Sequence, residues 1–185
     1  DQVRRHYAAC VSYVDEHVGM LMKELEASGA ADDTVILLWG DHGFHLGEHA
    51  IWGKHALFEE SLHSPLIIVS PKVKKPGVAA KGVVETLDIF PTLCDLAGLE
   101  IPDFAMGQSL LPMLQDPEAA GHSAVGYKRG TKTMRTDRYR LIAHDSGAME
   151  LYDHQSPEKE TMNIADKKPE LARELAAALE AKLKN

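Results

Sequence analysis

The sequence of 185 residues has little cysteine, few aromatic residues and no long apolar run. Its two cysteines, Cys10 and Cys94, each lie inside an apolar helical pattern, and we expect two buried free thiols. The longest uninterrupted apolar runs are about five residues, whereas a membrane-spanning helix needs about 20. The sequence therefore predicts no membrane span.

Positive charge is also in short supply. Lysine and arginine number 20 against 28 aspartates and glutamates, which gives a formal net charge of −8. This balance argues against a nucleic acid as the partner of the whole chain, because phosphate backbones are bound by basic surfaces. An anionic small substrate stays open, since a bound cation can reverse the local field.

Against these absences, one stretch stands out, TVILLWGDHGFHLGEHAIWGK at residues 34–54. Residues 35–39 predict a fully buried strand, and Asp41 and His42 follow directly after it. Ligands of α/β proteins bind outside the carboxyl ends of parallel strands, so this carboxylate and imidazole are well placed for chemistry. Five of the ten histidines lie in or near this stretch: His42, His45, His49, His55 and His63.

The first part of the chain has the pattern of an α/β protein. Apolar residues at spacings of four and three over 7–25 predict an amphipathic helix that Gly29 ends. A helix followed by a buried strand is half of a parallel crossover unit, and residues 66–69 predict a second buried strand. Further helices are expected at 56–63, at 87–97 with Thr86 as its cap and Gly98 as its stop, and around 109–114.

The pattern changes after residue 117. Short strands are predicted at 124–127, 132–135, 139–143 and 150–152, followed by a helix at 170–183. We therefore expect an α/β chain in two parts. Residues 1–117 would hold a partial, mainly parallel sheet flanked by helices, and residues 118–185 a small antiparallel α+β subdomain.

Asp41 and His42 are candidate metal ligands, but two ligands complete no metal site. Lys54 lies thirteen positions after Asp41, across a loop that can fold back over the strand end. An ammonium beside a metal suits a tetrahedral oxyanion such as sulfate or phosphate, because the charge on its oxygens must be held through the transition state. The alternative is that Asp41 and His42 are only turn residues at a strand end.

The run GDHGFHLGEHAIWGKHALFEESLHSPLIIVSP resembles the second half of a sulfatase of the alkaline-phosphatase superfamily, nearest to the branch of iduronate-2-sulfatase and its bacterial relatives. Three further segments resemble the regions around it in that family. They are RRHYAACVSYVDEHVGMLMKELEASG before it, VVETLDIFPTLCDLAGLEIP after it and MRTDRYRLIAHDSGAMELYDHQSPEKETMNIAD in the C-terminal subdomain. The resemblance covers essentially the whole chain as the C-terminal portion of such an enzyme.

This resemblance implies an alkaline-phosphatase-like fold and assigns roles to three residues. Asp41 and His42 correspond to metal ligands, and Lys54 to the catalytic lysine that binds the sulfate group. The implied metal is Ca²⁺, with Zn²⁺, Mg²⁺ or Mn²⁺ left open because an imidazole is a poor partner for a hard cation. His55, next to Lys54, is a candidate for substrate binding. The neighbouring loop residues either shape a substrate pocket or stabilise the loop: His45, Glu48, His49 and Trp52.

The chain departs from the family in one respect. Sulfatases take their nucleophile from a C/S-x-P-x-R motif that is modified to formylglycine, and neither Cys10, Cys94 nor any serine fits that pattern. The early aspartate pair that completes the metal site is also missing. The resemblance thus implies part of an active site that needs a missing N-terminal half.

The residues and the resemblance together leave three functions open. The first is a sulfatase acting on a sulfated small molecule or glycan, with uronate-containing glycans as one candidate. The rivals are a phosphonate or phosphate monoesterase of the same superfamily, and a fragment or binding module without turnover. The family resemblance suggests an exported (periplasmic or extracellular) or lysosomal protein.

Overall fold

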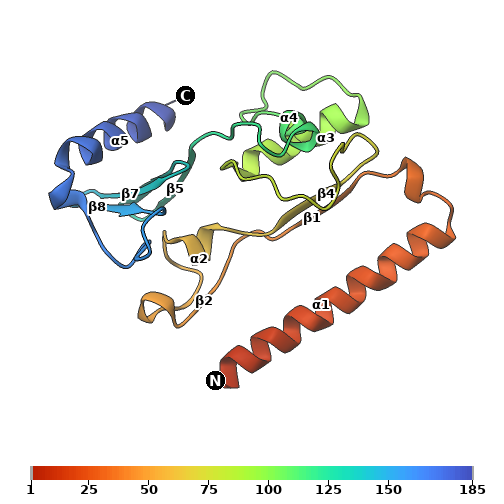
Figure 1. Ribbon diagram of the computed structural model, residues 1–185, viewed down its shortest axis with the longest axis horizontal. Coiled ribbons are helices and arrows are strands. Elements are labelled where there is room, and N and C mark those ends of the chain that lie inside the picture. The colour runs from red at the N-terminus through yellow and green to blue at the C-terminus, as the bar shows by residue number, and fades with distance from the viewer. Residues whose placement is uncertain (1, 185) are drawn as a thin grey trace.

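The computed structural model describes residues 2–184, which form helices and small antiparallel sheets (Figure 1). Short 3-10 turns add to the helices and strands at Ala31–Asp33, Glu48–Ala50, Thr86–Asp88 and Ala165–Lys167. In chain order the main elements are α1 (Gln2–Ala27), β1 (Ile36–Trp39), β2 (His45–Leu46), β3 (Trp52–Gly53), α2 (Glu59–Leu62), β4 (Leu66–Val69), α3 (Ile89–Ala97), α4 (Leu111–Gln115), β5 (Ala124–Lys128), β6 (Thr131–Arg135), β7 (Tyr139–His144), β8 (Met149–Asp153) and α5 (Pro169–Lys182).

The helix predicted at the N-terminus is confirmed as α1, which stands to one side of the molecule in Figure 1. None of its described side chains is buried, and the expectation of a buried Cys10 is wrong because that thiol is exposed. The apolar stripe is present on α1, but the other segments of residues 2–184 bury none of its side chains. The first turns of α1 do contact the loop at residues 44–52, where Arg4 Nε donates to the Leu46 carbonyl at 2.9 Å. None of the helices in the described range has the length and apolar content that crossing a bilayer requires.

The predicted parallel sheet is wrong. Strands β1 and β4 pair antiparallel, with Trp39 opposite Leu66 and Ile36 opposite Val69. No parallel pair occurs among the strands of residues 2–184. Nor are these strands fully buried, since Ile67 and Val69 are about half exposed. The segment between β1 and β4 holds no long helix to carry the chain back along the strand, so β4 starts where β1 ends.

Because Trp39 at the end of β1 pairs with Leu66 at the start of β4, residues 40–65 form one long loop that leaves and rejoins the sheet at the same end. We call this loop the excursion. The Gly40 N–H donates to the Pro65 carbonyl at 3.0 Å, which closes the excursion at its base. Within it lie the β2–β3 hairpin and the single turn of helix α2. Every candidate site residue of the chain is therefore carried by this one excursion.

Helix α3 ends as predicted, because Gly98 adopts a left-handed conformation (φ 72°) at its C-terminus. Its start differs from the prediction: Thr86 opens a 3-10 turn, and Glu85 and Asp88 form a capping box there instead. The buried Asp88 carboxylate also accepts from the Gln108 N–H at 2.9 Å and lies 2.7 Å from His122 Nε2. These contacts hold the long connection after α3 against the start of that helix.

Strands β5 to β8 form the predicted antiparallel meander, and α5 packs on one face of it. We call residues 124–182, which contain these five elements and the segments between them, the C-terminal sheet unit. Its core contains leucines with no exposed surface, and each such side chain contributes about 1.5–3 kcal/mol by burial. The buried members of this core are Met134, Leu141, Leu151, Ala165, Ala172 and Leu179. The division of the chain near residue 117 stays a prediction.

A buried ionic network joins helix α2 to the C-terminal sheet unit. Arg140, in the middle of β7, has a side chain that is only 2% exposed and pairs with Glu160 and with Glu59 of α2. His154 Nε2 lies 2.9 Å from the Glu160 carboxylate. Burial alone raises the pKa of Glu160, but the hydrogen bond with His154 and the charge of Arg140 outweigh it and lower the pKa to about 2.

This shift predicts a pH-dependent contribution to stability. Because the folded pKa lies below the ordinary 4.5, ionised Glu160 stabilises the fold fully above about pH 4.5, and the contribution is lost as the pH falls toward 2. Its size is on the order of 3 kcal/mol. Urea unfolding of wild type and Glu160→Gln should therefore differ most near neutral pH and converge in acid. Glu180→Gln, which removes an exposed partner of Lys132, is the control, and a Glu160→Gln difference independent of pH contradicts the assignment.

Candidate functional site

Asp41, His42 and Gly43 form a loop at the end of β1, which we call the Asp-His-Gly loop. The Gly43 N–H donates to the Ser61 carbonyl of α2 at 2.8 Å. A Cβ atom at Gly43 would lie only 2.1 Å from the Glu60 carbonyl oxygen, so this position accepts glycine alone. The loop is thus held directly against the backbone of α2.

The β2–β3 hairpin brings Lys54 back to this loop. His45 pairs with Gly53 in the hairpin, so the residue after β3 returns to the side of the chain from which β2 started. Lys54 Nζ lies 2.5 Å from His42 Nε2, and Asp41 Oδ2 lies 3.5 Å from the same nitrogen. Three predicted site residues from two segments are thereby brought together; their roles stay predictions.

The contacts of His42 define its tautomer. A lysine ammonium can only donate, so His42 Nε2 accepts from Lys54. The remaining proton is then on Nδ1, which donates to the Gly43 carbonyl at 2.7 Å. An imidazole whose Nδ1–H is held by a backbone carbonyl has its Nε2 lone pair oriented for a metal ion.

The donor set fits part of a cation site. Asp41 supplies an exposed carboxylate, 74% accessible, beside the partly buried His42 ring. Within residues 2–184, no third metal-binding side chain joins these two within the reach of one cation. Ca²⁺ takes six to eight oxygen ligands, so these two side chains alone would not complete a calcium site.

His55 is placed differently from Lys54. Its backbone carbonyl accepts a hydrogen bond from Lys128 Nζ on β5, while the residue as a whole is exposed. This contact fixes the chain just after Lys54 to the C-terminal sheet unit. A role of His55 in substrate binding stays a prediction.

The other loop residues make contacts within the excursion or with α1. His45 is fully buried, and the His49 ring stacks on Phe58 with centroids 4.0 Å apart. Glu48 accepts from the Leu46 N–H at 2.6 Å, and backbone hydrogen bonds from Glu48 itself and Leu46 lower the pKa of its carboxyl. The exposed Trp52 ring lies beside Arg4 of α1. These contacts favour the loop-stabilising interpretation over a substrate pocket.

Asp41 and His42 also border a large hollow of about 1090 Å³. Its walls come from β4, from the segment around residues 75–87 and from β5 and β6. Lys54 and His55 do not line it. The hollow therefore reaches Asp41 and His42 but not Lys54.

Sequence reasoning missed the residues that support the site from behind. Glu59 and Glu60 lie on α2, which contacts the loop, and Glu59 in turn contacts Arg140 and Glu160, the latter 101 positions further along the sequence. One signal was present in the sequence: Arg140 sits between apolar neighbours in a predicted strand, where a charge has to find a partner when buried.

Comparison with known proteins matches residues 1–99 to the sulfatase family. An N-acetylglucosamine-6-O-sulfatase of Bacteroides thetaiotaomicron is 35% identical over 181 residues, covering 90% of this chain and 32% of the relative. Human iduronate 2-sulfatase is 34% identical but covers only 55% of the chain and 23% of its own length. The expectation that iduronate-2-sulfatase is the nearest branch is therefore not supported.

Two solved structures share the fold. One, a complex with its substrate D-glucosamine-2-N,6-O-disulfate, has a TM-score of 0.82 at 32% identity and covers 95% of this chain and 40% of its own. The other, a phosphonate monoester hydrolase from Silicibacter pomeroyi, has a TM-score of 0.79 at 30% identity and covers 93% and 39%.

The chain spans about a third of the length of the curated relatives it matches. The matched residues 1–99 nevertheless make up more than half of the sequence, and they include α1, the Asp-His-Gly loop, Lys54 and helix α3. The chain belongs to the sulfatase family, within the alkaline phosphatase superfamily.

Proposed function

We propose that the protein carrying this chain hydrolyses sulfate esters and that the chain supplies one side of the active site. In this proposal Asp41 and His42 are ligands of Ca²⁺, and Lys54 binds the sulfate group. The observation that carries it is the meeting of these three side chains at one strand end, with Lys54 Nζ 2.5 Å from His42 Nε2, in a chain of the sulfatase family.

The geometry of His42 and Lys54 suggests how the two residues work together. His42 Nε2 has one lone pair, so it cannot accept from Lys54 and bind a cation at once. When His42 acts as a ligand, Lys54 Nζ is released and can donate to a substrate oxygen. Lys54 then stabilises the negative charge on the sulfate oxygens. The hydrogen bond from His42 Nδ1–H to the Gly43 carbonyl keeps the imidazole ring oriented. A bound divalent cation would add positive charge beside the same oxygens.

The nucleophile lies outside residues 1–185 in this proposal, because the C/S-x-P-x-R motif is absent from them. The relatives are about three times as long, and we infer that the N-terminal portion they have supplies both the nucleophile and the missing metal ligands. That portion is the main partner of this chain.

For the substrate we propose a sulfated glycan. The N-acetylglucosamine-6-O-sulfatase matches 90% of this chain, and the solved complex with a disulfated glucosamine has a TM-score of 0.82, which favours an amino sugar. A uronate sulfate remains a second candidate on the similarity to iduronate 2-sulfatase. A panel of 6-O-sulfated amino sugars and 2-O-sulfated uronates would rank the two classes.

A second candidate function is phosphonate monoester hydrolysis, which the similarity to the Silicibacter pomeroyi hydrolase favours. Both reactions need a cation and an ammonium around a tetrahedral oxyanion, so the geometry of Asp41, His42 and Lys54 serves either. The charge and the leaving group of the preferred substrate distinguish the two functions.

The test uses a protein that joins this chain to the N-terminal portion of the family. With Ca²⁺ present we expect release of nitrophenol from an aryl sulfate, and slower turnover of an aryl phosphonate monoester. Residues 1–185 alone should release none, because they lack a nucleophile and have two of the metal ligands. Turnover by the isolated chain would overturn the assignment of the nucleophile, and a preference for phosphonate would support the second candidate.

A further inference from the structure

Helix α2 is the common support of both segments that form the site. The Asp-His-Gly loop rests on it through the hydrogen bond from Gly43 to Ser61, 2.8 Å long. The hairpin that carries Lys54 reaches it through His49, whose Nε2 lies 3.6 Å from the Glu60 carboxylate. The relative position of His42 and Lys54 therefore depends on where α2 sits.

By itself α2 is a poor anchor. It is a single turn of four residues, and an isolated turn of that length does not hold its shape in water. Phe58 at its N-cap position offers no side-chain hydrogen bond. The Glu59 N–H instead donates to Oε2 of Glu160 at 2.7 Å, so a residue 101 positions away does the work of an N-cap.

Glu160 is in turn fixed by the C-terminal sheet unit. Its side chain is 4% exposed, and its Oε1 takes hydrogen bonds from Arg140 Nε and from His154 Nε2. Arg140 also donates to the Glu59 carboxylate, so the same guanidinium holds both glutamates. A chain of hydrogen bonds thus leads from β7 through Glu160 and α2 to the Asp-His-Gly loop.

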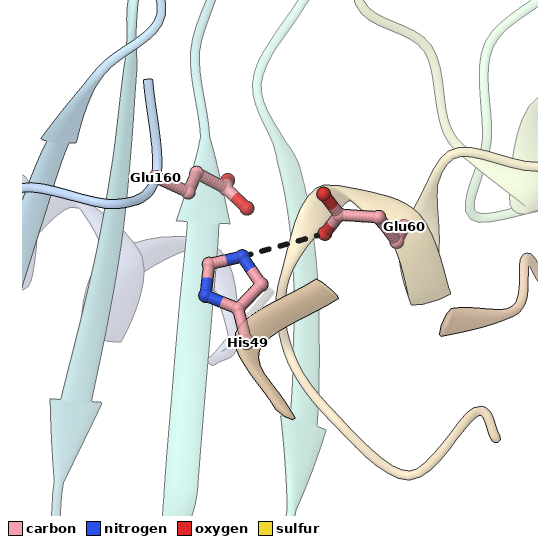
Figure 2. Close-up of side chains that lie close together, drawn as sticks. All are labelled: His49, Glu60 and Glu160. Atoms are coloured by element: carbon pink, nitrogen blue, oxygen red, sulfur yellow. Dashed lines mark ion pairs between the residues drawn. The ribbon is translucent and has the colours of Figure 1, made fainter. Parts of the chain in front are cut away.

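His49, Glu60 and Glu160 approach one another closely enough to share a cation (Figure 2). The partners of Glu160 argue against that use. Both of its oxygens already accept from N–H donors, and the Arg140 guanidinium already supplies positive charge beside this carboxylate. Glu160 instead forms a clamp of protein charges with Arg140 and Glu59.

We propose that Glu160 is a positioning residue of the active site, which acts through α2 on the Asp-His-Gly loop and on Lys54. This inference rests on the proposed function and adds a role for the C-terminal sheet unit in it. Glu160 touches no reacting group; it sets where His42 and Lys54 stand relative to each other.

The test is Glu160→Gln in the protein that includes the N-terminal portion. Glutamine keeps the side-chain volume of Glu160. Its amide NH₂, however, replaces one carboxylate oxygen and cannot accept the hydrogen bonds donated to that oxygen. We expect kcat to fall about tenfold to hundredfold, since a displacement of about 1 Å costs that much, with KM changed less than about twofold. Hydrogen exchange should also become faster within residues 41–63, including the Gly43 amide.

Leu179→Ala is the matched control. It removes a fully buried side chain from the core of the same unit without touching Glu160 or α2, and it destabilises the unit by a cavity. Below its melting temperature we expect normal kcat and normal exchange in residues 41–63. Should Glu160→Gln fail to fold, His154→Ala removes one of the two side-chain donors to Glu160 and should show the same pattern more weakly.

The two readouts separate this inference from the proposed function. If wild type has no sulfatase activity, the proposed function fails, while faster exchange confined to Glu160→Gln still supports the link through α2. If the sulfatase is active and Glu160→Gln retains kcat, or loses it only as much as Leu179→Ala does, the positioning role is overturned.

Discussion

Replacing Lys54 with alanine is expected to lower kcat about 10²–10³-fold, the usual cost of losing one preorganised donor to a developing oxyanion. The ammonium lies beside His42 and Asp41, where the sulfate oxygens are proposed to bind. Thermal stability should hardly change, because Lys54 is exposed and contributes little to the packed core. Steady-state kinetics on an aryl sulfate and a melting curve measure the two effects.

Two further variants sharpen this prediction. Lys54→Arg should recover only part of the rate, since a planar guanidinium does not replace a compact ammonium. Lys184→Ala removes another exposed lysine, which follows α5 and does not line the hollow that Asp41 and His42 border, and should leave kcat unchanged. Near-full activity in Lys54→Ala would show that Lys54 is an ordinary surface residue.

Local structure could be predicted well from the sequence. The C-terminal sheet unit follows from alternating apolar residues and turn signals, because neighbouring strands of a meander pair across short loops. The end of α3 follows from one residue, since Gly98 adopts the left-handed conformation that other residues avoid. Both predictions depend on contacts between residues close together in the sequence.

The pairing of β1 and β4 could not be predicted in the same way. Two apolar runs indicate two strands but not their relative direction, which depends on the path of the 26 residues between them. That path contains two short strands and one helical turn, so the chain returns to the strand end it left. The apolar stripe of α1 was ambiguous for a related reason: amphipathicity shows that a surface is covered, not which segment covers it.

The same distinction between local and long-range contacts applies to the site. Asp41 and His42 are neighbours, and Lys54 returns through a short hairpin, so the three side chains lie together while their roles stay predictions. The clamp formed by Glu59, Arg140 and Glu160 joins segments that no local pattern connects. A buried charge in the middle of β7 shows that a partner must exist, but only the fold identifies it.

Asp41→Asn is expected to abolish turnover in the protein that includes the N-terminal portion. The substitution keeps the size of the side chain and removes the negative charge that a divalent cation requires. Metal analysis should show loss of bound Ca²⁺ together with loss of activity. The fold should survive, because the Asp41 side chain is 74% exposed.

Asp33→Asn is the matched control for Asp41→Asn, because it alters an exposed aspartate at the opposite end of β1. Metal content and rate should both stay at the wild-type level in that variant. Excess Ca²⁺ should restore part of the activity of Asp41→Asn if His42 and the remaining ligands still bind weakly, whereas a purely structural defect would not respond to the metal. Unchanged metal content and rate in Asp41→Asn would remove Asp41 from the metal site and leave His42 and Lys54 to be explained as a hydrogen-bonded turn.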